Sequence, residues 1–155
     1  MQITARTDYA VRALIEIAGR PEGPTTRDEI AASQEIPPRY LEAVLGQLAK
    51  AGLVTGHRGA SGGYTLTRPA ASITVADAAR AVDGPLTLVG NRRPERVVYT
   101  GASAGMTDLW IGLRAAVRGV LESVTLEDLA AGRLPDAVRA LADDPDAWRS
   151  RVLPT

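Results

Sequence analysis

The sequence offers few side chains that could carry out chemistry. Cysteine is absent and histidine occurs once, at position 57. A chain without a thiol has no disulfide, zinc–thiolate site, cysteine-ligated cluster or cysteine nucleophile, and one imidazole excludes a multi-histidine metal site. His57 lies among glycines, a poor place to hold a catalytic base in fixed geometry. The acidic run Asp143-Asp144-Pro145-Asp146 lacks the ligand spacing of a calcium loop. We therefore expect no metal, no cofactor and no enzymatic activity.

A glycine-rich segment is the first candidate binding feature. It reads His57-Arg58-Gly59-Ala60-Ser61-Gly62-Gly63-Tyr64, and residues 55–68 hold two arginines and no acid. Glycines let the backbone approach a phosphate, and an arginine can enter a minor groove, where the negative potential is strongest. An enzymatic phosphate loop would need G-x-x-x-x-G-K-[ST] before a helix, whereas this segment has no lysine and leads into a strand pattern. A flexible hairpin without a ligand remains the alternative.

The start of a helix expected from residue 38 is the second candidate. A major groove admits one α-helix, and the N-terminal residues of that helix reach the base edges. Arg39 could contact guanine or phosphate, Tyr40 a phosphate or a thymine methyl, and Glu42 the amino group of cytosine. A solvated helix face would explain these residues on their own. The glycine-rich hairpin that follows them favours DNA binding.

Capping signals and apolar spacing predict the elements that position both features. The first expected element is a helix over 7–18, with Thr7 as N-cap and Gly19 at its end. A second helix is opened by the capping box Thr26-Arg27-Asp28-Glu29 and ends near 33–34. A third helix runs from Pro38 to about 51, with Leu41, Val44, Leu45 and Leu48 on its apolar face, and strands follow over 53–55 and 64–67. Three helices followed by a hairpin are the order of a winged helix-turn-helix.

The second half of the chain predicts a long apolar helix in addition to short helices and extended segments. A second capping pattern at Thr74 opens a helix to about residue 82. Residues 86–89 are expected to form a strand or an extended segment, and residues 97–99 are short and β-like. The longest helix signal covers 106–123 and would span about 27 Å. It is more apolar than one small module needs, which favours an inter-subunit helix over an intramolecular core helix. The expected dimerisation residues are Leu109, Leu113, Val117, Val120 and Leu121. A short helix follows Thr125, and a helical or loose tail ends the chain.

Several stretches together form one specific pattern. They are Thr7-Asp8-Tyr9-Ala10-Val11-Arg12-Ala13-Leu14, Pro38-Arg39-Tyr40-Leu41-Glu42, Leu48-Ala49-Lys50-Ala51-Gly52-Leu53-Val54, Arg58-Gly59-Ala60-Ser61-Gly62-Gly63-Tyr64, Trp110, and Val124-Thr125-Leu126-Glu127-Asp128-Leu129. This pattern resembles the Rrf2 family of bacterial transcription regulators over about residues 1–132. The resemblance implies a winged helix-turn-helix whose long helix is exchanged across a two-fold dimer, and whose recognition helix and wing contact palindromic DNA.

The sequence departs from the family at its sensor. Many Rrf2 regulators hold an iron–sulfur cluster on three cysteines in the segment before the long helix, and here residues 88–107 contain none. In some members an acidic residue at the position of Asp8 is a further ligand, but one carboxylate cannot replace three thiolates. We therefore interpret Asp8 as structural at a helix N-terminus and expect a cluster-free branch with an unknown small-molecule or protein effector, or none. A pocket between wing domain and long helix would be lined by Arg92, Arg93, Tyr99 and Trp110, unless these residues only pack or are solvated.

These observations predict a mainly α fold with a small β-hairpin, a winged helix-turn-helix plus a long dimerisation helix. The expected divisions are a DNA-binding domain over 1–84, a connecting segment over 85–105, the dimerisation helix and a short helix over 106–132, and a tail over 133–155. The predicted DNA-contacting residues are Thr26, Pro38, Arg39, Tyr40, Glu42, Ala43, Arg58, Gly59, Ser61, Gly62 and Gly63.

The zero net charge of the 155 residues argues against binding polyanions through bulk charge and restricts any DNA contact to a local patch. No apolar run reaches the length of a membrane span, and the first residues lack a signal-peptide pattern, so we expect a cytoplasmic protein. The function predicted is a homodimeric, sequence-specific regulator, most simply a repressor, whose partner is double-stranded DNA. The alternative is a small-molecule-binding or protein-interaction module that kept the fold but not operator recognition.

Overall fold

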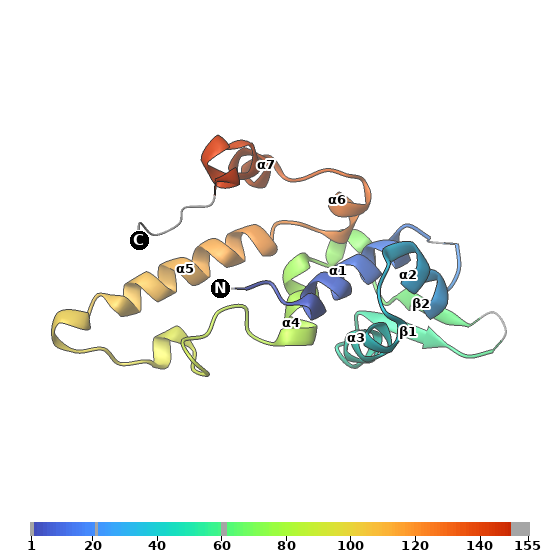
Figure 1. Cartoon of the computed structure of the whole chain (residues 1–155), viewed down its shortest axis with the longest axis horizontal. Helices are drawn as coiled ribbons and strands as arrows, with labels where there is room; N and C mark the ends of the chain where they lie inside the picture. The colour runs from blue at the N-terminus through green and yellow to red at the C-terminus, as the bar shows by residue number, and fades with distance from the viewer. Residues whose placement is uncertain (1, 21, 60–61, 150–155) are drawn as a thin grey trace.

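A helical body and a projecting arm make up the molecule in the computed structural model, which describes residues 2–20, 22–59 and 62–149 (Figure 1). The body contains α1 (Ala5–Ala18), α2 (Arg27–Gln34), α3 (Pro38–Lys50), the strands β1 (Val54–His57) and β2 (Gly63–Leu66), and α4 (Val75–Asp83). The arm contains the segment after α4 and the long helix α5 (Met106–Leu121). The chain then returns to the body at α6 (Leu126–Ala130) and ends with α7 (Asp136–Asp143).

Threonine caps begin most helices of the body. The capping boxes expected at Thr26, Thr74 and Thr125 are all confirmed, each with its side chain accepting from the third residue of the helix. The prediction for α1 was wrong by one turn. Thr4, and not Thr7, is the N-cap, while the hydroxyl of Thr7 lies inside the helix and donates to Asp83 at 2.7 Å. Gly19 does end α1, but with a φ of −72° and therefore without the left-handed cap that glycine permits.

The hairpin is a two-stranded antiparallel sheet in which Val54 pairs with Leu66 and His57 with Gly63. It begins and ends within about two residues of the expected strands. A further bridge joins Tyr64 to Thr25, with N–H to O distances of 3.0 Å and 2.9 Å in the two directions. The wing is therefore attached directly to the loop that precedes α2.

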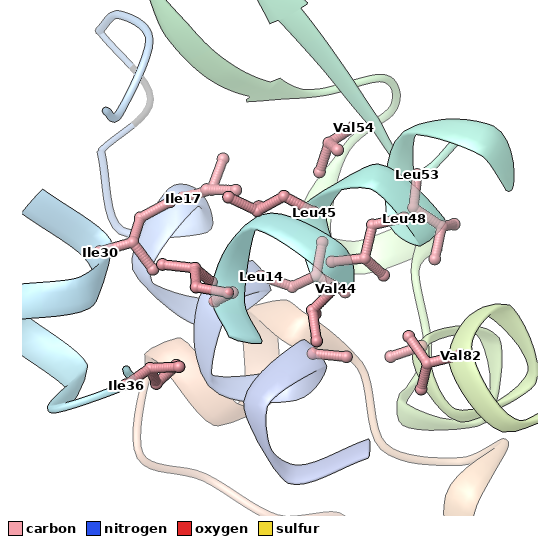
Figure 2. Packing of buried hydrophobic residues seen from close by; sticks show 14 of the residues in the cluster. Leu14, Ile17, Ile30, Ile36, Val44, Leu45, Leu48, Leu53, Val54 and Val82 are labelled. Carbon is pink, nitrogen blue, oxygen red and sulfur yellow. The ribbon is translucent and has the colours of Figure 1, made fainter. Parts of the chain in front are cut away.

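The core lies where α1, α2, α3 and α4 meet, and its side chains are aliphatic (Figure 2). Leu14 of α1, Ile30 of α2, and Leu41 and Leu45 of α3 have no exposed surface. Leu126 of α6 belongs to the same cluster and is also fully buried. The short helix after the arm therefore completes the core of the body, although it lies far along the chain from the other members.

The arm has little core of its own. The segments 86–89 and 97–99, which we expected to be extended, form no strand, and a single bridge joins Val89 to Arg92. Short 3₁₀ turns lie at Pro94–Arg96 and Gly101–Ser103, with others at Ala70–Ser72 and Pro145–Trp148. No residue of α5 is fully buried in the single chain, and Leu109 is 59% exposed. None of the helices formed by the described residues has the length and apolarity needed to cross a bilayer.

Candidate nucleic-acid interface

The first turns of α3 present the predicted recognition residues to solvent. Pro38, Arg39, Tyr40, Glu42 and Ala43 are all exposed, and Tyr40 is 64% accessible. They are exposed because α3 is amphipathic: its other face, made of Leu41, Val44, Leu45 and Leu48, is buried in the core. Pro38 occupies the first helical position, where its missing N–H costs nothing. The structure therefore places these five residues together on one accessible helix end.

The wing is shaped by glycines, one held at a positive φ with open space around it and two closely approached by backbone atoms. Gly59 has a φ of +106°, and a Cβ on Gly62 would lie 2.6 Å from the carbonyl oxygen of His57. A Cβ on Gly63 would lie 2.7 Å from the carbonyl oxygen of Thr25. Arg58 is exposed beside these glycines, whereas Ser61 lies outside the described residues. Nε2 of His57 is 2.8 Å from the Thr65 hydroxyl, so the one imidazole lies across the hairpin.

Thr26, which we predicted to contact DNA, has a structural role in the capping box of α2. Its hydroxyl accepts from the N–H of Glu29 and lies 2.7 Å from the Glu29 carboxylate, which also accepts from the N–H of Thr26. These hydrogen bonds from Thr26 hold the pKa of Glu29 below its ordinary value. Because the side chain is used by the cap, Thr26 fixes the start of α2 beside the wing.

Arg27 is a candidate interface residue that the sequence reasoning missed. It is exposed at the start of α2, with its Nη1 3.6 Å from Oε2 of Glu42 on α3 and its Nη2 3.0 Å from Asp28. The carboxylate of Glu42, which we expected to accept a hydrogen bond from cytosine, is therefore already close to the guanidinium group of Arg27 on the neighbouring helix. Arg27 is the first residue of α2, inside the capping box that begins at Thr26. Because α2 is the helix that precedes the predicted recognition helix, this position was the signal that could have identified Arg27.

The four residues predicted for an effector pocket lie in the arm as two separate pairs. The indole N–H of Trp110 on α5 donates to the hydroxyl of Tyr99 at 3.2 Å. Arg92 and Arg93 line a cavity of about 620 Å³, and Arg93 also lines a neighbouring cavity of about 500 Å³. Neither cavity is lined by Tyr99 or Trp110.

The residues predicted for dimerisation are divided along α5. Leu109 and Leu113, toward the tip of the arm, are 59% and 38% exposed. Val117, Val120 and Leu121, nearer the body, line a mostly apolar groove of about 700 Å³ that α1 and α4 complete. A single chain therefore leaves apolar side chains of α5 uncovered both in the groove and at the tip of the arm.

Comparison with known proteins gives a consistent result. A family model named Rrf2 and described as "Iron-dependent Transcriptional regulator" matches residues 3–132. A candidate HTH-type transcriptional regulator of Mycobacterium tuberculosis is 43% identical over 151 residues, which cover 97% of this chain and 94% of that protein. The HTH-type transcriptional regulator CymR of Bacillus subtilis is 38% identical over 84% of this chain and 90% of its own length.

Solved structures agree with these sequence matches. The structure of CymR, described as the global cysteine regulator of B. subtilis, aligns with a TM-score of 0.68 and covers 85% of this chain and 98% of that one, at 35% identity. A transcriptional regulator from Listeria innocua aligns with a TM-score of 0.74 and 31% identity, over 98% of this chain and 97% of that one. The mainly helical winged helix-turn-helix fold expected from the sequence is thereby confirmed.

The iron in the family description does not fit the residues of this chain. No cysteine occurs anywhere in the sequence. Among the residues that the structure describes, no group of three or more His, Cys, Asp and Glu side chains is placed to hold a metal ion. In the arm, six of the 13 residues that line the two cavities are arginines, which as cations do not ligate iron, and Glu95 is their one carboxylate.

Proposed function

The chain belongs to the Rrf2 family of DNA-binding transcription regulators, and from this premise we propose that it is a homodimer that represses genes by binding palindromic operators without an iron–sulfur cluster. The observation that carries the proposal is the exposed N-terminal end of α3 next to a wing in which backbone atoms leave no room for a side chain at Gly62 and Gly63. A helix end supplies contacts to base edges, and a narrow, arginine-bearing hairpin supplies contacts to a neighbouring groove.

Homodimerisation is supported by the exposure of apolar side chains on α5. A helix of 16 residues with no fully buried side chain is unusual in an isolated chain, and Leu109 and Leu113 are exposed on it. A second copy of α5 would cover this surface, and a two-fold dimer uses the same patch on both copies. Two recognition helices related in this way read half-sites about one helical turn apart, which is why we propose palindromic operators.

DNA selection from a genome tests the proposal directly. The full-length protein is incubated with sheared genomic DNA from its source, and the retained fragments are sequenced at near-physiological salt, where non-specific binding is weak. We expect one palindromic consensus that overlaps promoters, and reduced transcription from those promoters when the protein is added to purified polymerase. As the control, Tyr40→Ala, which removes an exposed ring of α3, should retain the fold and lose the consensus.

The test also separates the proposal from its alternative. Fragments without a shared sequence would contradict operator recognition and favour a module that kept only the fold. A non-palindromic consensus would contradict the two-fold arrangement, and activation at the bound promoters would contradict repression. Because the DNA target is chromosomal, we also propose that the protein acts in the cytoplasm.

A further inference from the structure

Arginines are concentrated where α4 meets the arm. Two neighbouring cavities of about 500 and 620 Å³ share Pro85 and Arg93. Glu95 is the one carboxylate that lines either of them. The arginines that line them are Arg80, Arg92, Arg93, Arg96, Arg114 and Arg118. The whole chain has 17 arginines and zero net charge, so this accumulation leaves a strongly positive site on a neutral protein.

Only part of this charge is neutralised within the chain. Arg114 pairs with Glu95, and Glu122 of the α5 C-terminus pairs with both Arg80 and Arg118. Hydrogen bonds to Glu122, the larger effect from Arg118 and the smaller from Arg80, keep its pKa below its ordinary value. This carboxylate is therefore charged and bound to these two arginines.

The other three arginines of the site form no ion pair with the described residues, although the positive charge of Arg93 does act on Glu95. Among the described residues, no carboxylate lies within ion-pair distance of Arg92, Arg93 or Arg96. Like charges held together without partners repel each other, and a bound anion would relieve that repulsion.

A buried hydroxyl at the same place also lacks a partner. The hydroxyl oxygen of Thr87 is buried and makes no hydrogen bond with the described residues, although Thr87 lines the smaller cavity. A buried polar atom without a partner costs about 1–3 kcal/mol. Pro85 and Leu86 line the cavity next to it and add apolar surface. The site therefore combines unpaired guanidinium groups, one unsatisfied hydroxyl and a small apolar wall.

We propose that these arginine-lined cavities bind a small organic polyanion, with phosphoryl or carboxylate groups on the guanidinium groups, and that this ligand is the effector of the regulator. The proposal rests on the proposed function for its regulatory half. Guanidinium groups bind phosphate and carboxylate in a two-pronged geometry that an ammonium group cannot supply. Arg93, which lies on both cavities, is the residue through which one ligand would reach both.

The site has a short physical connection to the recognition helix. Arg80 lies on α4, and Val82 of the same helix belongs to the same buried cluster as Leu48 of α3 (Figure 2). Gly84 ends α4 with a φ of +79° and lines the smaller cavity as well. An anion that contacts Arg80 and Arg93 together would fix the arm relative to α4 and, through it, the position of α3. Linkage then requires operator DNA to change the affinity for the anion by the same factor.

The experiment is calorimetric titration of the full-length protein with two probes, inorganic pyrophosphate for the phosphoryl arm and citrate for the carboxylate arm. Sodium chloride at matched ionic strength serves as the baseline, because it screens charges without bridging the guanidinium groups. Arg93→Gln is compared with Arg139→Gln, which removes the same charge from an exposed position on α7 that lines neither cavity. Mobility shifts on a selected genomic fragment are recorded with and without the probe that binds.

We expect saturable binding of at least one probe with a Kd of about 1 mM or tighter, weakened about tenfold or more by Arg93→Gln and unchanged by Arg139→Gln. The probe that binds identifies the phosphoryl or the carboxylate source. No saturable binding, or equal weakening by both variants, would overturn the site. Specific binding with an unchanged mobility shift would overturn its regulatory role. If no fragment is ever selected, the proposed function fails, while the calorimetry still decides the site.

Discussion

Replacement of Gly63 by alanine should detach the wing from the body. Gly63 has a φ of +149°, and a Cβ there would lie 2.7 Å from the carbonyl oxygen and 2.8 Å from the carbonyl carbon of Thr25. Both contacts are with backbone, which cannot rotate away as a side chain can. The bridge between Thr25 and Tyr64 must therefore open to admit the methyl group.

The cost follows from what the bridge contains. Two backbone hydrogen bonds of 3.0 Å and 2.9 Å are lost, each worth about 0.5–1.5 kcal/mol. A non-glycine residue at positive φ adds about 1 kcal/mol of strain. We therefore expect Gly63→Ala to lower the free energy of unfolding by about 2–4 kcal/mol.

Gly56→Ala is the matched control. Gly56 lies on the partner strand opposite Tyr64, and a Cβ there would meet only the ring of Tyr64, at 3.6 Å. Its effect on unfolding should stay within about 0.5 kcal/mol. Urea unfolding followed by circular dichroism measures both variants, and amide exchange should show lost protection at Tyr64 and Thr25 in Gly63→Ala alone. Equal unfolding free energies for the two variants would refute the reasoning.

Three further predictions concern charge, DNA and assembly. Burial raises the pKa of Asp83, but hydrogen bonds from Thr4 and Thr7 lower it more, and the net shift is downward. Wild-type stability should therefore fall as pH drops from about 3.9, whereas Asp83→Asn should already be about 1–3 kcal/mol less stable at pH 7 and lose less on acidification, as urea titrations at pH 7 and pH 3 would show. Arg58→Ala should weaken operator binding and reduce the slope of log affinity against log salt by about 0.9 in mobility shifts, and an unchanged slope would exclude a phosphate contact. Leu109→Arg should give monomers in sedimentation experiments, because it places a charge on the surface proposed to pair with a second α5. The monomers should remain helical, because Leu109 is already 59% exposed in one chain, and persistent dimers would place the interface elsewhere.

The features that the sequence predicted correctly are those decided by near neighbours. The three capping boxes at Thr26, Thr74 and Thr125 each depend on residues within one turn, and all three are present. The N-cap of α1 was predicted wrongly, because Thr4 and not Thr7 accepts from the first turn of the helix. The hydroxyl of Thr7 instead donates to Asp83, 76 positions away, and no local pattern reveals such a partner.

The arm was less predictable for a related reason. Residues 86–89 and 97–99 have the composition of strands, but a strand needs a pairing strand, and the described chain supplies only the isolated bridge from Val89 to Arg92. The arginine site was only half found. Arg92 and Arg93 are adjacent in the sequence, whereas Arg80 and Arg114 join them only through the fold. Dimerisation and DNA contacts remain predictions that the residues motivate.

The return of α6 to the body makes the arm a closed loop. The N–H of Val75 donates to the carbonyl of Val124 at 3.0 Å, and the N–H of Leu126 donates to the carbonyl of Ile73 at 2.9 Å. Closing a loop of about 50 residues costs about 3–4 kcal/mol of chain entropy when the loop is disordered.

If a second α5 or a ligand holds the arm in one conformation, the arm loses less conformational entropy when α6 packs onto the body. Stiffening therefore strengthens the seating of Leu126, which is fully buried in the core of the body. Pairing of two arms, as proposed above, would in this way be thermodynamically coupled to the integrity of the core through chain entropy, with no direct contact required. A chain released before residue 126 would also lack the last part of its core, so the DNA-reading body can be completed only after the arm has been synthesised.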